Sequence, residues 1–296
     1  MTEPLRISRH FFKGHGLGND YLVFRAEEDG WPLSPEAVRR ICHREEGVGS
    51  DGIVVLVGRS GAGPGPFLLR MFNPDGSEFE RSGNGLRVLG AFLLAEGEVG
   101  GEPFLVESGG DRIEMEVVGE GPGGVSVLTV EMGRASLAPE SVHLDPERTA
   151  EEGGGLAHPD LGAVDFQAVS VGNPHCVVFT EEDPEESVDA LGLFLAVHPA
   201  FREGTNVQVV RVAGERKLRI AIWERGVGRT AASGTSSCAA AVASVARGLV
   251  PAGEVEVEMA GGALHVTVTE ELDVVLRGPV QEVFRGELSP AFAEAL

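Results

Sequence analysis

The sequence contains two matching segments, residues 82–97 and 233–248, that lie 151 positions apart in a chain of 296 residues. Each begins with Ser-Gly, ends with Gly and is apolar around much of the helical circumference in between. Ser is a favoured N-cap and Gly a favoured helix terminator, so helices are predicted over 83–96 and 234–247. A helix that is apolar all round is buried, and a repeat at half the chain length indicates duplication. The sequence therefore predicts two similar domains, each built around one buried helix.

The segments between these helices are short, rich in Val, Leu and Ile, and separated by glycine and proline, which make 59 of the 296 residues. Residues 255–259 and 265–269 alternate between apolar and polar, which is typical of half-buried strands. The connections 259–263 and 270–273 predict hairpins. Strands are expected over 21–24, 53–57, 67–72, 112–118, 125–132, 166–171, 176–180, 206–212, 218–223, 255–259, 264–269 and 273–277, and further helices over 34–42 and 184–191.

These elements predict an α/β (α+β) fold with two pseudo-symmetric domains. The stretch 119–124 is rich in Gly, Pro and acidic residues and is expected to be a linker. We therefore assign residues 1–124 to the N-terminal domain and 125–277 to the C-terminal domain. The last strands are expected to return, so residues 278–296 complete the N-terminal domain.

Charge and hydropathy exclude several classes of protein. The net charge of −22, from 24 basic and 46 acidic residues, argues against a surface for nucleic acid or anionic membrane. No apolar run reaches the length of a membrane-spanning helix, and the N-terminus lacks a signal-peptide pattern. A cytoplasmic protein with a small-molecule substrate is expected. The sequence does not decide the oligomeric state, and a homodimer stays open.

Cofactor and metal motifs are missing from the sequence. Three cysteines without a C-x-x-C pair and histidines without H-E-x-x-H predict neither a disulfide framework nor a metal site. The two lysines, Lys13 and Lys217, are in no obvious site, which disfavours a pyridoxal Schiff base. Phosphate-loop and Rossmann spacings are also missing. We therefore expect no cofactor and no metal.

The two helix N-termini are candidate carboxylate sites. Gly83 and Gly234, each following a serine, allow a ligand to approach the first backbone N–H groups, where the helix dipole adds roughly half a positive charge. Two such N-termini, one from each domain, are expected to face across one cleft. Ordinary N-capping by Ser82 and Ser233 is the alternative interpretation.

Several predicted turns carry polar side chains that a strand or loop alone does not need. Asn19, Asn73 and Asn173 lie in turns, Asn206 begins a strand, and Glu224-Arg225 ends one. A guanidinium binds a carboxylate, whereas amide oxygens and a Glu carboxylate accept from an ammonium. This combination suits an α-amino carboxylate.

Together and in this order, the motifs at 15–20, 49–52, 73–77, 82–85, 172–175, 204–207, 224–226 and 233–235 resemble those of diaminopimelate epimerase, in the fold family shared with proline racemase. The resemblance runs almost from end to end. It implies two pseudo-symmetric domains, each a strand barrel around a central helix. It also implies conversion of LL- to meso-diaminopimelate without a cofactor, a step in the biosynthesis of lysine and peptidoglycan precursors.

The resemblance further implies a two-base mechanism, in which one thiolate removes the Cα proton and a thiol on the opposite face returns one. Both helix N-termini would stabilise the carboxylate as it becomes an enediolate. The implied substrate-binding residues are Asn19, Asn73, Gly83, Asn84, Gly85, Asn173, Asn206, Glu224, Arg225, Gly234 and Thr235, with His175 in a supporting role.

The sequence departs from the family at both base positions, because Ser82 and Ser233 stand where the epimerases have cysteine. A thiol has a pKa near 8.5 and a helix N-terminus lowers it further, whereas a hydroxyl is a far weaker acid. Cys238 lies five residues into its helix, so we expect a buried structural role for it. Impaired or absent epimerase activity is therefore predicted.

Several alternatives stay open. The serines reflect either natural divergence, which we favour because nothing in the sequence marks an edit, or a deliberate pair of Cys→Ser changes. The chain is an epimerase, a non-catalytic amino-acid binding protein, or a diverged isomerase or racemase with another substrate. The full set of Asn, Glu and Arg residues favours diaminopimelate over proline, since a second amino-carboxylate end needs its own partners.

Overall fold

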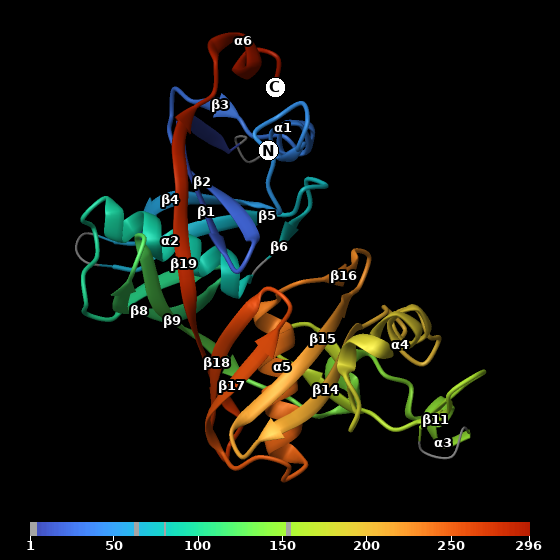
Figure 1. Cartoon of the computed structure of the whole chain (residues 1–296). Coiled ribbons are helices and arrows are strands. Elements are labelled where there is room, and N and C mark those ends of the chain that lie inside the picture. The colour runs from blue at the N-terminus through green and yellow to red at the C-terminus, as the bar shows by residue number, and fades with distance from the viewer. Residues whose placement is uncertain (1–4, 62–64, 80, 152–154) are drawn as a thin grey trace. The chain divides into compact units, whose positions relative to one another are not determined.

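The chain divides into two compact units in a computed structural model that describes residues 5–61, 65–79, 81–151 and 155–296 (Figure 1). Unit 1 comprises Met1–Glu131 and Gly278–Leu296, and unit 2 comprises Met132–Arg277. The chain passes from one unit to the other within strands β9 (Val125–Arg134) and β19 (Asp273–Glu287). The first crossing lies seven residues beyond the boundary expected from the sequence.

The prediction of a linker at 119–124 was wrong. These residues form the end of β8 (Asp111–Gly121) and the turn that joins it to β9, with Gly121 paired to Val125. Gly123 and Gly124 adopt φ angles of 76° and 75°, which a tight turn requires and which favour glycine. A cluster of glycines therefore marked a hairpin here.

Unit 1 combines strands with three helices. Its elements are β1 (Arg6–Gly16), β2 (Asn19–Ala26), β3 (Trp31–Pro32), α1 (Pro35–Cys42), β4 (Ile53–Arg59), β5 (Phe67–Phe72), β6 (Glu78–Phe79), α2 (Gly83–Ala95), β7 (Phe104–Ser108), β8, part of β9, the end of β19 and α6 (Pro290–Ala293).

Unit 2 repeats this mixture and adds short helical segments. Its elements are η1 (Pro139–Val142), α3 (Pro146–Glu151), β10 (Leu156–His158), β11 (Gly162–Val164), β12 (Gln167–Ser170), β13 (Pro174–Phe179), η2 (Pro184–Glu186), α4 (Val188–Leu195), β14 (Asn206–Gly214), β15 (Lys217–Glu224), β16 (Gly228–Thr230), α5 (Gly234–Ala246), β17 (Gly253–Met259), β18 (Gly262–Val268) and the start of β19.

The two units share one pattern of strand pairing. In unit 1, β2 runs parallel to β4, β4 antiparallel to β5, and β5 parallel to β7. In unit 2, β13, β14, β15 and β17 repeat that order and those directions. The register partners Leu22, Ile53 and Phe72 thus correspond to Cys176, Val207 and Trp223. This correspondence lets positions in one unit be matched to positions in the other.

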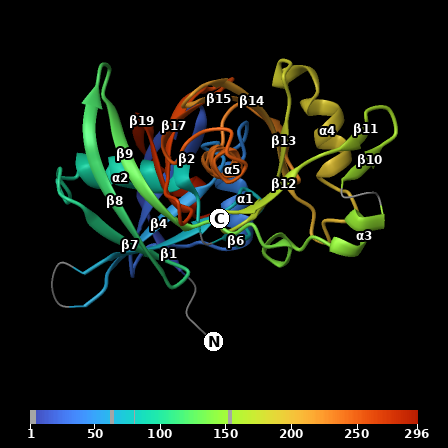
Figure 2. The same ribbon diagram turned by 90° about the horizontal axis from the view of Figure 1, so that it is seen from below.

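The two repeated segments form the helices that the sequence predicts, to within one residue at the C-terminal end. Residues 83–93 of α2 are all buried, and α5 is buried from Gly234 to Ser244 except at Thr235. Within unit 1, α2 packs against β1, β2, β4 and β8, whereas in unit 2 α5 packs against β12, β13, β14, β15, β17 and β18. Figure 2 shows α5 nearly end-on inside an arc of its unit's strands. Closure of each strand layer into a complete barrel stays a prediction.

Most other predicted elements are confirmed, including α1, the strands and both hairpins, and most strand pairs are antiparallel. The helix predicted over 184–191 is instead a 3₁₀ helix followed by α4, with Ser187 as the residue between them. Strand β1 and the short strands β3, β6, β7, β10, β11 and β16 lie outside the predicted ranges, and β19 continues from the predicted 273–277 into the region where the last strands were expected to return. β1 carries Arg, His and Lys side chains, and its buried and exposed positions do not alternate regularly. The two-residue periodicity of a strand is therefore hidden in its sequence.

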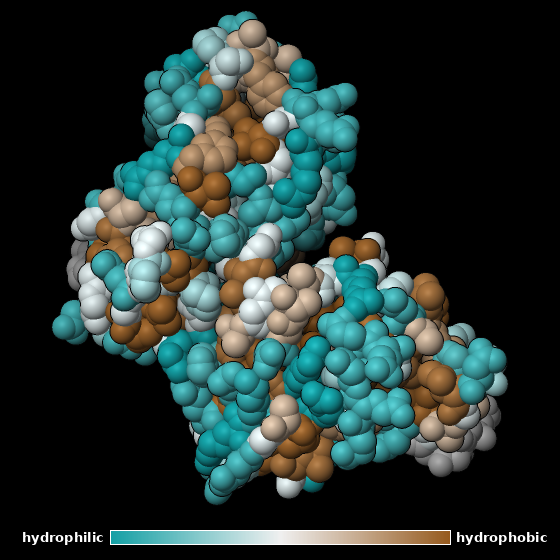
Figure 3. All heavy atoms as spheres, viewed as in Figure 1, coloured by the Kyte–Doolittle hydropathy of each residue, from teal (hydrophilic) through white to brown (hydrophobic). Residues whose placement is uncertain are grey.

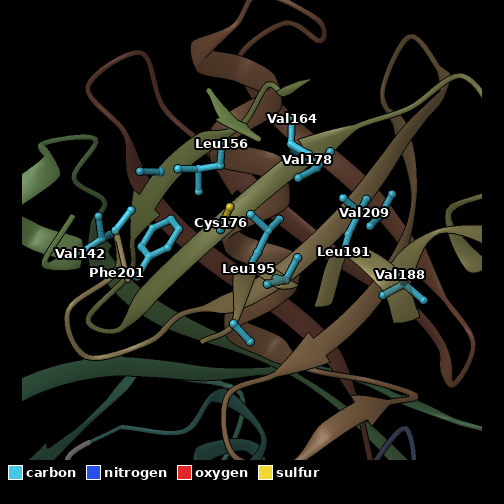
Figure 4. Close-up of a cluster of buried hydrophobic side chains, with 14 of the residues drawn as sticks. Val142, Leu156, Val164, Cys176, Val178, Val188, Leu191, Leu195, Phe201 and Val209 are labelled. Atoms are coloured by element: carbon cyan, nitrogen blue, oxygen red, sulfur yellow. The ribbon is translucent and has the colours of Figure 1, made fainter. Parts of the chain in front are cut away.

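The apolar cores lie inside each unit. In unit 2, a cluster around Cys176, Leu195 and Phe201 fills the space between α4 and the strands (Figure 4). In unit 1, a second cluster joins α1 to β2 and β4. On the face shown in Figure 3, hydrophobic residues form separate small groups within a largely hydrophilic surface. No helix in the described part of the chain is long and apolar enough to cross a membrane.

Candidate functional site

The N-terminus of α2 is capped by Ser82, as the sequence predicts. Ser82 is extended, with φ −138° and ψ 120°, and its Oγ accepts the backbone N–H of Gly85 at 3.1 Å. A helix leaves its first N–H groups without intrahelical partners, so this turn presents donors to an incoming anion. A Cβ on Gly85 would lie 3.2 Å from the ring of Tyr21, so glycine allows the tyrosine to pack against the first turn.

Asn19 and Asn84, both predicted site residues, are hydrogen-bonded to each other. The Nδ2 of Asn84 donates to Asn19 Oδ1 at 2.8 Å, and Asn19 Nδ2 donates to Asp51 Oδ2 at 3.0 Å. The guanidinium of Arg87, which is fully buried, donates to Asn84 Oδ1. The first turn of α2 and the β1–β2 turn are therefore joined in one hydrogen-bond network.

A cluster of ion pairs that includes Asp51 supports this hydrogen-bond network. Asp20 pairs with Lys13 and with Arg44, each at 2.8 Å, and Arg44 also pairs with Asp51 at 2.6 Å. Burial opposes ionisation of Asp20, but its hydrogen bonds to Arg44, Lys13 and Asp51 outweigh burial and lower its pKa. Burial, with the nearby negative Asp20, raises the pKa of Asp51 despite the backbone hydrogen bond that it accepts from Asp20. The motif at 49–52 thus holds Asn19 in place.

Asn73 lies in the turn between β5 and β6. Its backbone N–H donates to the carbonyl of Ser77 at 2.8 Å, and its Nδ2 donates to Ser77 Oγ at 3.0 Å. Asn73 directly follows Phe72, the register partner of Ile53. It therefore stands at the same end of the unit 1 sheet as the start of β4.

The N-terminus of α5 matches that of α2. Ser233 is extended, with φ −152° and ψ 127°, and its Oγ accepts the backbone N–H of Ser236 at 3.4 Å. The hydroxyls of Ser233 and Thr235 lie 3.5 Å apart, and Gln208 Nε2 donates to Ser236 Oγ at 3.0 Å. The hydroxyl side chains of Ser233, Thr235 and Ser236 thus lie at the first turn of α5, next to Gly234.

His175 is fully buried beside Asn173, with 2.8 Å between His175 Nε2 and Asn173 Oδ1. Burial lowers the pKa of His175 to about 3, the positive charge of Arg225 adds to this effect, and the nearby side chain of Gln208 opposes it. The imidazole is therefore neutral at pH 7.

Asn206 connects three strands at one end of the unit 2 sheet. Its Nδ2 donates to the carbonyl of Pro174 at 3.0 Å, and its Oδ1 accepts the backbone N–H of Arg225 at 3.0 Å. The exposed guanidinium of Arg225 donates to the carbonyl of Glu203 at 2.7 Å. Glu224 is half-buried as the last residue of β15. The beginnings of β13 and β14 and the end of β15 meet here.

Hydrogen bonds connect several of the predicted residues within each unit, and the strand register places Asn73 and Glu224 at corresponding positions. Strand register and the helix repeat match Asn19 with Asn173, Asn73 with Glu224, and Ser82 with Ser233. They also match Tyr21 with His175, so each unit places a ring at the strand position beside its helix N-terminus. Sequence analysis missed Gln208, Arg87 and Asp51 as supports.

A detectable signal existed for two of these supports. Gln208 is the one polar residue in the apolar run 207–210, and Arg87 is the one charge within α2. The three cysteines are buried, and burial raises the pKa of Cys42 to about 11 and that of Cys176 further. Cys238 is fully buried inside α5, as expected. Among the described residues no group of three or more His, Cys, Asp or Glu side chains could hold a metal ion.

Solved structures with this fold include several epimerases and racemases. A hydroxyproline epimerase from Agrobacterium vitis, with trans-4-hydroxy-L-proline bound, matches with a TM-score of 0.68 at 15% identity and covers 99% of this chain and 96% of its own. A predicted epimerase from Pseudomonas aeruginosa matches with a TM-score of 0.65 at 19% identity, over 95% and 99% of the two chains. These matches define the fold of the chain as the mixed α/β fold that such proteins share.

The sequence comparisons narrow this fold class to one family. The diaminopimelate epimerase profile matches residues 11–138 and 167–283. A protein named diaminopimelate epimerase 2 from Nostoc sp. is 38% identical over 94% of this chain and 95% of its own length. A diaminopimelate epimerase from Heliobacterium modesticaldum is 37% identical over 94% of this chain and 99% of its own. The chain belongs to the diaminopimelate epimerase family and is an isomerase of the amino-acid epimerase and racemase class.

Proposed function

We propose that the chain binds diaminopimelate in the manner of an epimerase of LL- and meso-diaminopimelate. Its two base positions, Ser82 and Ser233, carry hydroxyl groups, which are far weaker acids than the thiols that this reaction requires. The observation that carries this proposal is the pair of matching helix N-termini, each with a serine cap followed by glycine. Family membership supplies the substrate class. Two-base inversion requires residues 82 and 233 on opposite faces of one α-carbon. We further propose that the strands of each unit close into a barrel around its central helix.

The binding set supports an amino acid with two amino-carboxylate ends. First-turn N–H groups at Gly83 and Asn84, and at Gly234 and Thr235, would donate to the reacting carboxylate as it gains enediolate charge, while Gly85, whose N–H donates to Ser82 Oγ, would line the site. Asn73, Asn206 and Arg225 would bind the distal end, and Glu224 would accept from an ammonium. Asn19 and Asn173 would complete the site around the substrate.

Serine at both base positions predicts little or no epimerase activity. A hydroxyl has no useful alkoxide population near pH 7 without an adjacent base, even where a helix dipole favours the anion. His175, which lies beside Asn173, is held neutral by burial, and its neighbour Gln208 donates to the hydroxyl of Ser236 and not to that of Ser233. Substrate would therefore be held and left largely unconverted.

A second candidate function follows from the same observation. A protein that keeps the polar binding set but lacks both thiols suits a non-catalytic role in binding an amino acid. A diverged isomerase with another substrate is the third reading, favoured if diaminopimelate does not bind.

Two measurements on the native chain test the proposal. Calorimetry with LL-, meso- and DD-diaminopimelate is expected to show binding, with proline as the comparison ligand. Proton NMR of diaminopimelate in deuterated buffer is expected to show very slow loss of the α-proton signal. Failure to bind any isomer would refute the proposed substrate, and rapid exchange with inversion would refute the argument about serine acidity.

A further inference from the structure

A row of four polar side chains adjoins the first turn of α5. His175 Nε2 lies 2.8 Å from Asn173 Oδ1, and Gln208 Nε2 donates to Ser236 Oγ at 3.0 Å. His175 and Gln208 lie on the adjacent parallel strands β13 and β14, two register positions apart and therefore on one face of the sheet, and the Gln208 side chain is close enough to affect the pKa of His175. The backbone N–H of Ser236 continues the row to Oγ of Ser233. The row thus joins a proposed substrate-binding amide to a base position.

The middle of this row is deeply buried and incompletely hydrogen-bonded. His175, Gln208 and Ser236 are each 0% exposed. Leaving a buried polar atom without a partner is unfavourable, because the atom has lost its hydrogen bonds to water. Among the described residues, the buried side-chain atoms that lack a hydrogen-bond partner include one from each of these two side chains, His175 Nδ1 and Gln208 Oε1.

The cause is a conflict of hydrogen-bond direction. A neutral imidazole carries one N–H, and the oxygen of Asn173 requires that hydrogen on Nε2, so Nδ1 is an acceptor. Gln208 donates to Ser236 with its nitrogen, so the atom that it has left for the ring is its unpartnered oxygen, which is also an acceptor. Amide nitrogen and oxygen have nearly the same shape, so rotation of one amide by half a turn resolves the conflict.

We propose that Gln208 is a positioning residue that fixes the tautomer of His175 and thereby the edge that Asn173 presents to the substrate. With the Gln208 amide turned, its nitrogen donates to Nδ1 and its oxygen accepts from the hydroxyl of Ser236. His175 then keeps its hydrogen on Nε2 and donates to Asn173 Oδ1. The Nδ2 of Asn173 is left as an outward donor, which suits a carboxylate.

The opposite direction of the hydrogen bonds in this row predicts a different ligand group at Asn173. If the Asn173 amide turned instead, its oxygen would face outward, accept from an ammonium and repel a carboxylate. We favour the first arrangement because the helix N-terminus beside the row also binds anions. This choice of ligand group rests on the proposed function, whereas the tautomer of His175 does not.

The tautomer is measured directly by ¹⁵N NMR of the imidazole nitrogens in the native chain between pH 6 and 8. The His175 signals are assigned by their loss in His175→Gln. We expect one neutral form with hydrogen on Nε2. Hydrogen on Nδ1, or a protonated ring, would overturn the inference whether or not the chain binds diaminopimelate.

Gln208→Glu tests the link to binding with little change of shape. A carboxylate can only accept hydrogen bonds, so it places the hydrogen of the imidazole on Nδ1. The hydrogen bond between His175 and Asn173 then runs in the opposite direction. We expect the tautomer to change and binding of LL-diaminopimelate to weaken about tenfold. Retention of both the native tautomer and the native affinity would overturn the inference.

Two further variants complete the design. Gln208→Leu removes both hydrogen bonds and should give mixed tautomers with weakened binding, which provides a second test if Gln208→Glu does not fold. Ser244→Ala is the matched control, because Ser244 is a buried hydroxyl of α5 that donates to the carbonyl of Ala240 at 2.8 Å, outside the row. It should leave tautomer and affinity unchanged.

Discussion

The side-chain oxygen of Asn206 accepts the backbone N–H of Arg225 at 3.0 Å. Because Asn206 Nδ2 also donates to the carbonyl of Pro174, both ends of this amide are engaged within the protein. Each end retains one further hydrogen-bonding capacity, so Asn206 can contact a ligand while it fixes the backbone that carries Arg225. The start of β14 thereby sets the position of the guanidinium proposed to bind the distal carboxylate.

Replacement of Arg225 by alanine is expected to weaken diaminopimelate binding by about 2–4 kcal/mol, because a desolvated carboxylate would lose its charged partner. Calorimetry measures this loss. Arg216→Ala is the matched control, since Arg216 is an exposed arginine that also donates to backbone carbonyls, those of Ala252 and Glu254. Equal affinities in Arg225→Ala and the native chain would remove Arg225 from the binding site.

Restoring sulfur at both base positions should create or restore epimerase activity. In Ser82→Cys with Ser233→Cys, the helix dipole at each position favours the thiolate. We expect a rise of at least about a hundredfold in α-deuterium uptake and in interconversion of stereoisomers. An inactive double variant that still binds diaminopimelate would contradict the proposed mechanism.

The single cysteine variants separate the two proton transfers. Inversion needs a base on one face and an acid on the other, so each single variant should invert far more slowly than the double variant. One cysteine alone can still exchange the α-proton of one stereoisomer with solvent. Deuterium uptake measured separately on LL- and meso-diaminopimelate checks this, and full inversion by either single variant would argue against two bases.

The buried imidazole of His175 should make stability depend on pH. Its pKa is lowered to about 3 in the folded protein and is about 6.5 in the unfolded chain, so below pH 6.5 the unfolded state binds the proton first. The stabilisation is complete above pH 6.5 and is lost as the pH falls toward 3. Between pH 7 and 5 this loss amounts to about 2 kcal/mol.

Urea unfolding at pH 7 and pH 5 measures this effect. His175→Gln lacks the titrating group, so it should lose about 2 kcal/mol less than the native chain over the same interval. Other titrating groups contribute equally to both proteins. Equal losses would show that His175 is accessible to protons in the folded state.

Gly192 should be essential to the packing behind Glu224 and Arg225. A Cβ at Gly192 would lie 2.3 Å from Cγ of Trp223, which immediately precedes those residues on β15. Gly192→Ala is therefore expected to cost about 1–3 kcal/mol of unfolding free energy and to weaken ligand binding. Leu193→Ala on the same helix, where the side chain is 64% exposed, should change stability by less than about 0.5 kcal/mol. Unchanged stability in Gly192→Ala would contradict this close contact.

The sequence by itself determined the features that depend on neighbours in the chain. Ser82 and Ser233 cap helices at the predicted positions, because an N-cap acts within its own first turn. Alternation placed strands such as β17 and β18, and the 151-residue repeat indicated the duplicated pairing pattern. The motifs of the family were likewise readable without coordinates.

The tertiary structure decided what depends on groups far apart in the sequence. Nothing next to His175 in the chain predicts its neutrality, which results from burial inside the folded unit and from the positive charge of Arg225, 50 residues away. The hydrogen bonds that hold Asn19 come from Asp51 and Asn84, on a later loop and helix. Solvent exclusion and hydrogen-bond direction are properties of packed neighbours, so only the folded chain sets which edge each amide presents.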